Sequence, residues 1–195
     1  MLTDFIEYVD SLFPSVSESV KNKAKECIRQ FEEQHKKINY LMGEPLDDLS
    51  QGDIISKIPF TFVSDTGEQR YFYSQGMIIS TSCDIDNHDL ISFVPLHSLN
   101  DYKNDTRVIT SNQCLPYMYL PDIKIQDYYV NFETMCSYNK NWILKLLSDG
   151  KITRIASLSQ VGYYFFLCKF SAFLFRREDT FSQYKRTQTD PNILQ

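Results

Sequence analysis

Hydrophobic residues recur at helical spacing in the first part of the chain. They do so across residues 3–12, and again from the candidate cap Ser17 to Ile38, which predicts two helices within an N-terminal extension, residues 1–42. Charges of both signs cover the other face of the longer helix. Such mixed charge is typical of a solvated helix face rather than of a nucleic-acid contact.

From Gly43 onward the pattern changes to short β-type runs that are separated by turn residues. Tight turns between short strands are typical of a meander that closes into a small barrel. We therefore expect a β-barrel over residues 43–135, within one domain that spans residues 1–195. The predicted strands cover residues 52–63, 70–73, 76–81, 90–96 and 128–132, and the predicted turns cover 65–67 and 86–89.

The last organised segment is apolar on almost every side and predicts a C-terminal helix over residues 155–178. Only Lys169 is charged between Val161 and Phe175, and we expect its ammonium group to reach water along an apolar stem. The segment is shorter than the roughly 20 residues that a bilayer span needs, so we expect no membrane anchor. We expect another protein or a second copy of this chain to bind here, with the N-terminal helices as the alternative cover. The proposed contacts are Phe166, Phe170 and Phe173.

The composition of the chain indicates a packed core, and its net charge makes some classes of partner less favourable. The chain has 195 residues, of which 43% are hydrophobic and 14% aromatic, so we expect a globular α+β domain. Its formal charge of -5 argues against binding nucleic acid or anionic membrane through the overall field. The five cysteines form no C-x-x-C pair, which predicts reduced thiols, and the N-terminus has no secretory signal pattern; both favour a cytoplasmic protein.

The densest group of chemically versatile residues follows the predicted strand 76–81. Cys83 with His88 and a carboxylate would suit a metal, Cys83 with His97 would suit a nucleophile and base, and Asp84 with Asp86 would suit Mg²⁺. The structural interpretation is favoured, because metal sites need more ligands at recognisable spacing. In it Cys83, Asp84 and Asp86 build a turn, with Cys83 buried and Asp84 accepting backbone hydrogen bonds. We expect no metal and no cofactor.

Arg70, Tyr71 and Tyr73 offer a cation beside stacking rings, which makes a nucleic-acid contact possible. Alternation along a strand places Tyr71 and Tyr73 on one face and Arg70 with Phe72 on the other. A core strand with one wet face is therefore the favoured interpretation of this segment.

Four short segments follow one another in the middle of the chain: GDII at 52–55, TGEQ at 66–69, QGMIIS at 75–80 and FVPLHS at 93–98. In this order they resemble the MazF/PemK family, the SH3-like barrel toxins of bacterial toxin–antitoxin loci. The resemblance implies an SH3-like fold and, in that family, ribonuclease activity that depends on an Arg and a Thr. The matching positions here are Gln75 and His97, so we expect a binding or regulatory module without this activity. The alternative is a divergent endoribonuclease that uses His97, Cys83 or Gln75.

Two further segments are STSCDI at residues 80–85 and RIASLS at residues 154–159, the latter leading into the apolar helix. They resemble segments of uncharacterised bacterial proteins that accompany phage-defence loci. This resemblance implies a bacterial setting of antiviral defence or of the toxin–antitoxin type, and it implies no mechanism.

Overall fold

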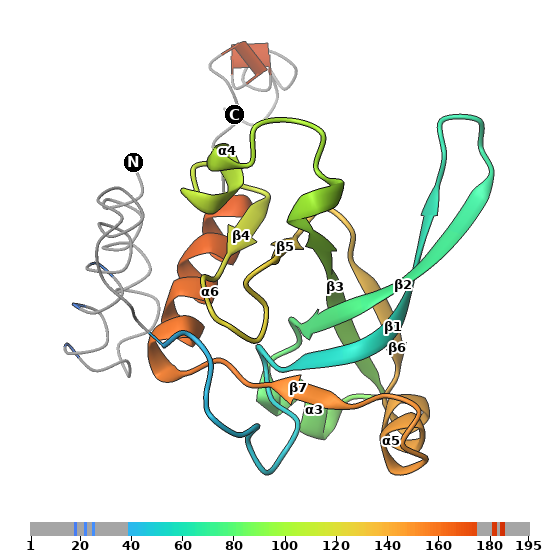
Figure 1. The fold of residues 1–195 in the computed structure, drawn as a ribbon. Coiled ribbons are helices and arrows are strands. Elements are labelled where there is room, and N and C mark those ends of the chain that lie inside the picture. The colour runs from blue at the N-terminus through green and yellow to red at the C-terminus, as the bar shows by residue number, and fades with distance from the viewer. Residues whose placement is uncertain are drawn as a thin grey trace, which may run out of the picture.

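The computed structural model describes residues 39–174 and the separate positions 18, 22, 25, 181, 182, 184 and 185 (Figure 1). The predicted helices before residue 39 and the end of the predicted C-terminal helix lie outside these described residues. The described part is an α+β fold around a seven-stranded antiparallel sheet, which confirms the predicted class. Its strands are β1 (Ile54–Val63), β2 (Gln69–Ile78), β3 (Leu90–Ser98), β4 (Tyr117–Tyr119), β5 (Tyr128–Asn131), β6 (Cys136–Asn139) and β7 (Arg154–Ala156).

Helices fill the connections between these strands and follow the last one. The longest described helix, α6, follows β7 directly, so it begins later than the predicted residue 155. The helices are α3 (Ser82–Asn87), η1 (Leu99–Asp101), α4 (Arg107–Thr110), α5 (Lys140–Ser148) and α6 (Gln160–Leu174).

The sheet is open, with strand order β4-β5-β3-β2-β1-β7 and with β6 paired to β3. A closed barrel of backbone ladders, as the sequence predicted, is therefore not formed. Side chains of β6 nevertheless reach the free edge of β1. The Tyr138 hydroxyl donates to the carbonyl of Pro59, and the Cys136 thiol lies 3.9 Å from the carbonyl of Thr61. The strands β6, β3, β2 and β1 thus curl toward a barrel without completing it.

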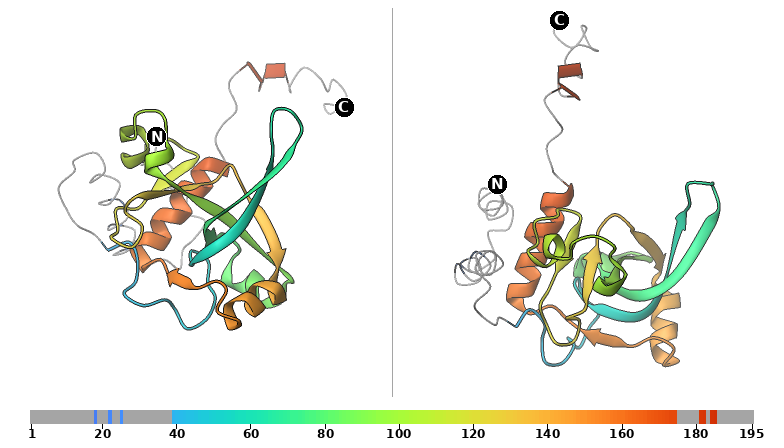
Figure 2. Two further views of the ribbon diagram at one scale, coloured as in Figure 1. Left: turned by 45° about the vertical axis from the view of Figure 1, so that its right-hand side comes forward. Right: turned by 45° about the horizontal axis from the view of Figure 1, so that its top comes forward.

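The two faces of the sheet support separate hydrophobic clusters. On one face Met77, Val94 and Leu96 pack with buried residues of α6 such as Phe165. On the other face the cluster lies within the curl and includes Ile58, Phe60, Phe93, Ile85 of α3 and Ile143 of α5. In both views of Figure 2, α6 lies along one side of the sheet and the β1–β2 hairpin extends away from it.

Gly162 sets the start of α6 against the segment that precedes the sheet. A Cβ atom at this position would lie 2.1 Å from the carbonyl oxygen of Tyr40, a distance that no side chain tolerates. Beside it, the Ser159 amide donates to that same Tyr40 carbonyl at 2.8 Å, and Leu41 forms a β-bridge with Leu158. Residues 40–41 are therefore fixed to the helix start.

Among the described residues, no helix combines the length and apolar character that crossing a membrane requires.

Candidate functional site

A line of aromatic rings crosses one face of the sheet. Register pairs His97 of β3 with Tyr129 of β5, so their side chains share a face. The His97 ring lies 5.5 Å from that of Phe72 and 5.8 Å from that of Tyr129, measured between centroids. Phe62 extends the line at the β1 end, and Tyr117 and Tyr102 extend it beyond Tyr129. We name these six residues the aromatic row: Phe62, Phe72, His97, Tyr129, Tyr117 and Tyr102.

His97 occupies the middle of the aromatic row. Its Nε2 atom is buried and has no hydrogen-bond partner in the structure. Burial lowers the pKa of His97 below 6.5, and the nearby Asp101 carboxylate opposes that shift. The imidazole is therefore neutral at physiological pH.

The three tyrosines at the far end pack edge to face. The Tyr117 and Tyr129 rings lie 5.1 Å apart, and Tyr102 contacts both. Burial, reinforced by Tyr117, Tyr102 and Asp101, raises the pKa of Tyr129 to about 12. Burial first, and then the Glu133 carboxylate, raises the pKa of Tyr117. These phenols stay protonated, and carboxylates border them.

Part of the aromatic row remains accessible to solvent. Phe62 is 44% exposed, and Phe72, His97, Tyr117 and Tyr102 are half-buried, whereas Tyr129 is buried. Edges and faces of several rings are therefore available to a ligand that lies across the strands.

Gln75 does not share this face with His97. Register pairs Gln75 of β2 with Leu96 of β3, and Leu96 belongs to the cluster on the α6 side. Because neighbouring residues of a strand point to opposite faces, His97 lies on the other side of the sheet. The buried Oε1 atom of Gln75 has no partner in the structure. The two positions that match the MazF/PemK ribonuclease residues are thus not brought together.

The predicted turn at Cys83, Asp84 and Asp86 is wrong, because these residues form helix α3. Thr81 caps this helix by accepting a hydrogen bond from the Asp84 amide at 3.1 Å, and this cap makes a helical turn more favourable than an open one. Cys83 is exposed rather than buried. Asp84 is also exposed and does not accept backbone hydrogen bonds; its carboxylate lies 3.6 Å from His88 Nε2.

The structure does not support the three functional interpretations of this segment, namely a metal site, a Cys83–His97 pair and a Mg²⁺ site. The Cys83 sulfur is contacted by the Asn87 side-chain amide on the same helix, whereas the His97 ring lies among Phe72 and Tyr129. Within the described ranges, no three His, Cys, Asp or Glu side chains are grouped closely enough to hold a metal ion.

Arg70, Tyr71 and Tyr73 lie on the β1–β2 hairpin. Tyr71 is 74% exposed and Tyr73 is 67% exposed, on the face of β2 opposite to Phe72, as alternation predicted. Arg70 pairs with Glu68 at 3.2 Å, so its charge is partly neutralised. These three residues do not form one surface with the cation beside the rings.

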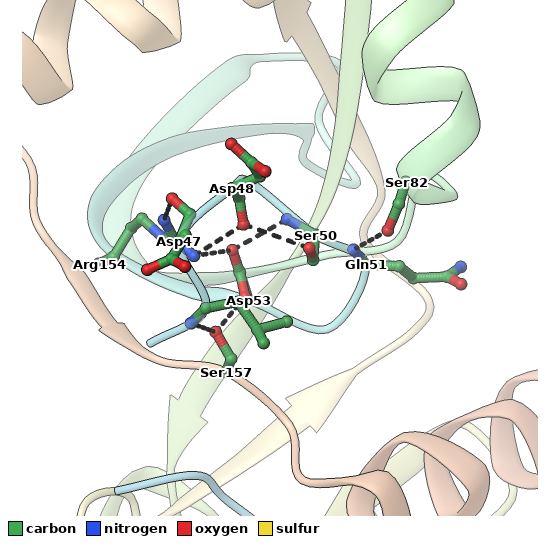
Figure 3. A network of polar contacts seen from close by, with 9 residues as sticks. Asp47, Asp48, Ser50, Gln51, Asp53, Ser82, Arg154 and Ser157 are labelled. Atoms are coloured by element: carbon green, nitrogen blue, oxygen red, sulfur yellow. Dashed lines mark hydrogen bonds and ion pairs between the residues drawn. The ribbon is translucent and has the colours of Figure 1, made fainter. Parts of the chain in front are cut away.

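A buried ionic network, which the sequence did not reveal, lies where the loop before β1 meets β7 (Figure 3). The Asp53 side chain is fully buried and forms an ion pair with Arg154, whose Nη2 atom lies 3.0 Å from Asp53 Oδ2. It also accepts from the Ser157 hydroxyl at 2.5 Å and from the Ser50 amide at 3.0 Å. Burial outweighs these favourable contacts and raises the pKa of Asp53.

The same network fastens the loop before β1. Arg154 donates to the carbonyls of Asp47 at 3.0 Å and Asp48 at 2.9 Å, and the Ser157 hydroxyl accepts from the Leu46 amide at 2.9 Å. These contacts join β7 and Ser157 to residues 46–53, whereas the buried Nε atom of Arg154 has no partner in the structure. The network explains GDII and RIASLS as structural partners.

Of the proposed contacts on α6, Phe166 is enclosed, whereas Phe170 and Phe173 are partly exposed. Phe166 is fully buried and stacks on Phe170 with centroids 5.5 Å apart. Phe170 and Phe173 are half-buried and both contact Phe132. Phe166 therefore has no surface to offer a partner. Lys169, expected to reach water, is fully buried instead.

Three comparisons with known proteins complete this picture: no family model, no curated protein and no solved structure matches the chain.

Proposed function

We propose that this protein is a binding or regulatory module without ribonuclease activity. The observation that carries the proposal is the separation of Gln75 and His97 on opposite faces of the sheet. Phosphodiester cleavage needs its acid–base and charge-stabilising groups on one substrate position. A neutral His97 within a set of rings, without a converging cation, is better suited to contact than to chemistry.

An SH3-like barrel of the MazF/PemK type remains our proposal for the fold. The curl of β6, β3, β2 and β1 supports it, since the Tyr138 hydroxyl bridges the gap to β1 and a hydrophobic cluster fills the interior. The proposed setting, a bacterial phage-defence or toxin–antitoxin-like system, rests on the two sequence resemblances alone.

The aromatic row is the surface that we propose for binding. It places partly exposed rings from several strands side by side, and aromatic side chains are the residues that most often anchor interfaces. The α6 surface suits this role less well, because Phe166 is enclosed. The hairpin residues Tyr71 and Tyr73 lack a free cation, because Arg70 pairs with Glu68.

Incubation of purified protein with single-stranded RNA tests the absence of ribonuclease activity. We expect the RNA to remain intact, since the loss of one preorganised charge contact typically costs about 10²–10³ in rate. The His97→Ala variant, purified in the same way, controls for contaminating nuclease. Cleavage by the wild-type protein that disappears in a folded His97→Ala variant would establish the endoribonuclease alternative instead.

A further inference from the structure

We infer that the aromatic row binds an extended, basic peptide segment of a partner protein. This inference rests on the proposed function as a binding module and names the class of its ligand. It follows from the carboxylates around the rings and from the geometry of the rings.

Carboxylates border the tyrosine end of the aromatic row. Asp101 ends the turn η1, directly after the strand that carries His97, and Asp127 lies directly before β5. The Leu99 amide donates to the Asp127 carbonyl at 2.8 Å, so these two acidic segments lie side by side. Glu133 follows β5, and its carboxylate contributes to the raised pKa of the Tyr117 phenol. All three acidic residues are exposed.

Three carboxylates outnumber Lys103, the exposed cation that follows Tyr102 in the chain. Burial is the largest cause of the pKa shifts of His97, Tyr117 and Tyr129, and the carboxylates that contribute to them are Asp101 and Glu133. At the other end of the row, Arg70 is opposite Phe62 in the ladder and pairs with Glu68. The field over the described surface of the row therefore favours a positively charged ligand.

Rings bordered by carboxylates match the chemistry of arginine and lysine side chains. A guanidinium group stacks on an aromatic face and gains cation–π energy, while a neighbouring carboxylate accepts its N–H groups. An extended segment suits a row that runs across neighbouring strands.

The same features disfavour a single strand of nucleic acid. Such a strand also stacks its bases on rings, but it needs a positively charged path for its phosphates. Asp101, Asp127 and Glu133 would repel those phosphates. The two classes of ligand therefore give opposite results with the same set of probes.

Fluorescence anisotropy of the full-length protein with three labelled probes tests the inference. The probes are a short peptide that alternates arginine with serine, the same peptide with glutamate in place of arginine, and an oligouridine strand. We expect the arginine peptide to bind, with affinity that falls as salt rises, and the other two probes not to bind.

Matched variants then locate the binding surface. Asp101→Asn combined with Glu133→Gln should weaken binding of the arginine peptide by about tenfold, because two charge contacts are lost. Glu44→Gln combined with Asp86→Asn removes the same charge from exposed positions elsewhere and should change affinity less than about twofold. Among ring variants, Tyr102→Leu should weaken binding, and Tyr71→Leu, on the opposite face of the hairpin, should not.

Three results would overturn the inference: no binding of the arginine peptide, binding of oligouridine instead, or equal losses in the two charge variants. Circular dichroism of each variant confirms that folding is retained. These failures differ from failure of the proposed function, which would appear as RNA cleavage. A protein that binds no peptide and leaves RNA intact would disprove the peptide ligand alone.

Discussion

At the scale of single residues, the Asp53–Arg154 ion pair is the contact on which the loop before β1 depends most. A carboxylate that is fully buried needs compensation, and here it comes from Arg154, Ser157 and the Ser50 amide. Asp53, Arg154 and Ser157 lie in the segments GDII and RIASLS, which the sequence analysis singled out. The partners are nevertheless separated by about a hundred residues, as the spacing of 104 between Asp53 and Ser157 shows, so sequence alone did not pair them.

Replacing Arg154 by methionine should lower the free energy of unfolding by about 3–5 kcal/mol, because Asp53 would remain buried without its cation. Urea unfolding measures the change. The control is Arg107→Met, which breaks the exposed pair with Asp105 and should leave the free energy of unfolding almost unchanged. The double variant Asp53→Asn with Arg154→Met should recover part of the loss. Equal effects of Arg154→Met and Arg107→Met would show that the network contributes little.

At the scale of elements, Lys169 joins α6 to the loop that precedes β4. Its ammonium group donates to the carbonyls of Asn112 at 2.9 Å and Cys114 at 2.8 Å. The Asn112 side chain in turn bonds the backbone of Tyr119 in both directions, at 2.8 and 2.9 Å. The buried Lys169 therefore connects α6 to this loop, because backbone carbonyls rather than water accept its hydrogen bonds.

Burial lowers the pKa of Lys169 from 10.5 to about 8, which predicts a pH dependence. Between these values the unfolded chain binds more protons than the folded chain, so the contribution of Lys169 to stability rises with pH. We expect the difference in unfolding free energy between wild type and Lys169→Met to increase from pH 8 to pH 10, by at most about 1.4 kcal/mol per pH unit. Carrying Cys114→Ser in both proteins removes the neighbouring thiol. A difference that stays constant or falls would contradict this assignment.

The elements that sequence predicted well are those with long, regular spacing. Alternation located β1 and β3, and the apolar run located most of α6. The predictions failed where short-range capping or distant partners decide the structure. Thr81 converts a predicted turn into α3, and the Asn139 side chain, which accepts from the amides of Asn141 and Trp142, begins the unpredicted α5. The three-residue strand β7 was not predicted, because it forms only by pairing with the distant strand β1.

At the scale of the whole molecule, the twofold alternation of the strands separates two candidate residues that the sequence resemblance had grouped. Gln75 lies on the α6 side, whereas His97 lies among the rings on the other face. Sequence identified both positions, but only the register of β2 against β3 assigned their faces. The remaining residues of the aromatic row were not predicted, because Tyr102, Tyr117 and Tyr129 come from segments that fold together only through the sheet.

Nuclear Overhauser contacts of the His97 ring and the Gln75 side-chain amide test this central claim most directly. The structure predicts contacts from His97 to the rings of Phe72 and Tyr129, and contacts from the Gln75 amide to the methyl groups of Leu96. Spectra of the His97→Gln variant provide the assignment control. Contacts of the Gln75 amide with the His97 ring or with Phe72 would place both residues on one face and contradict the account.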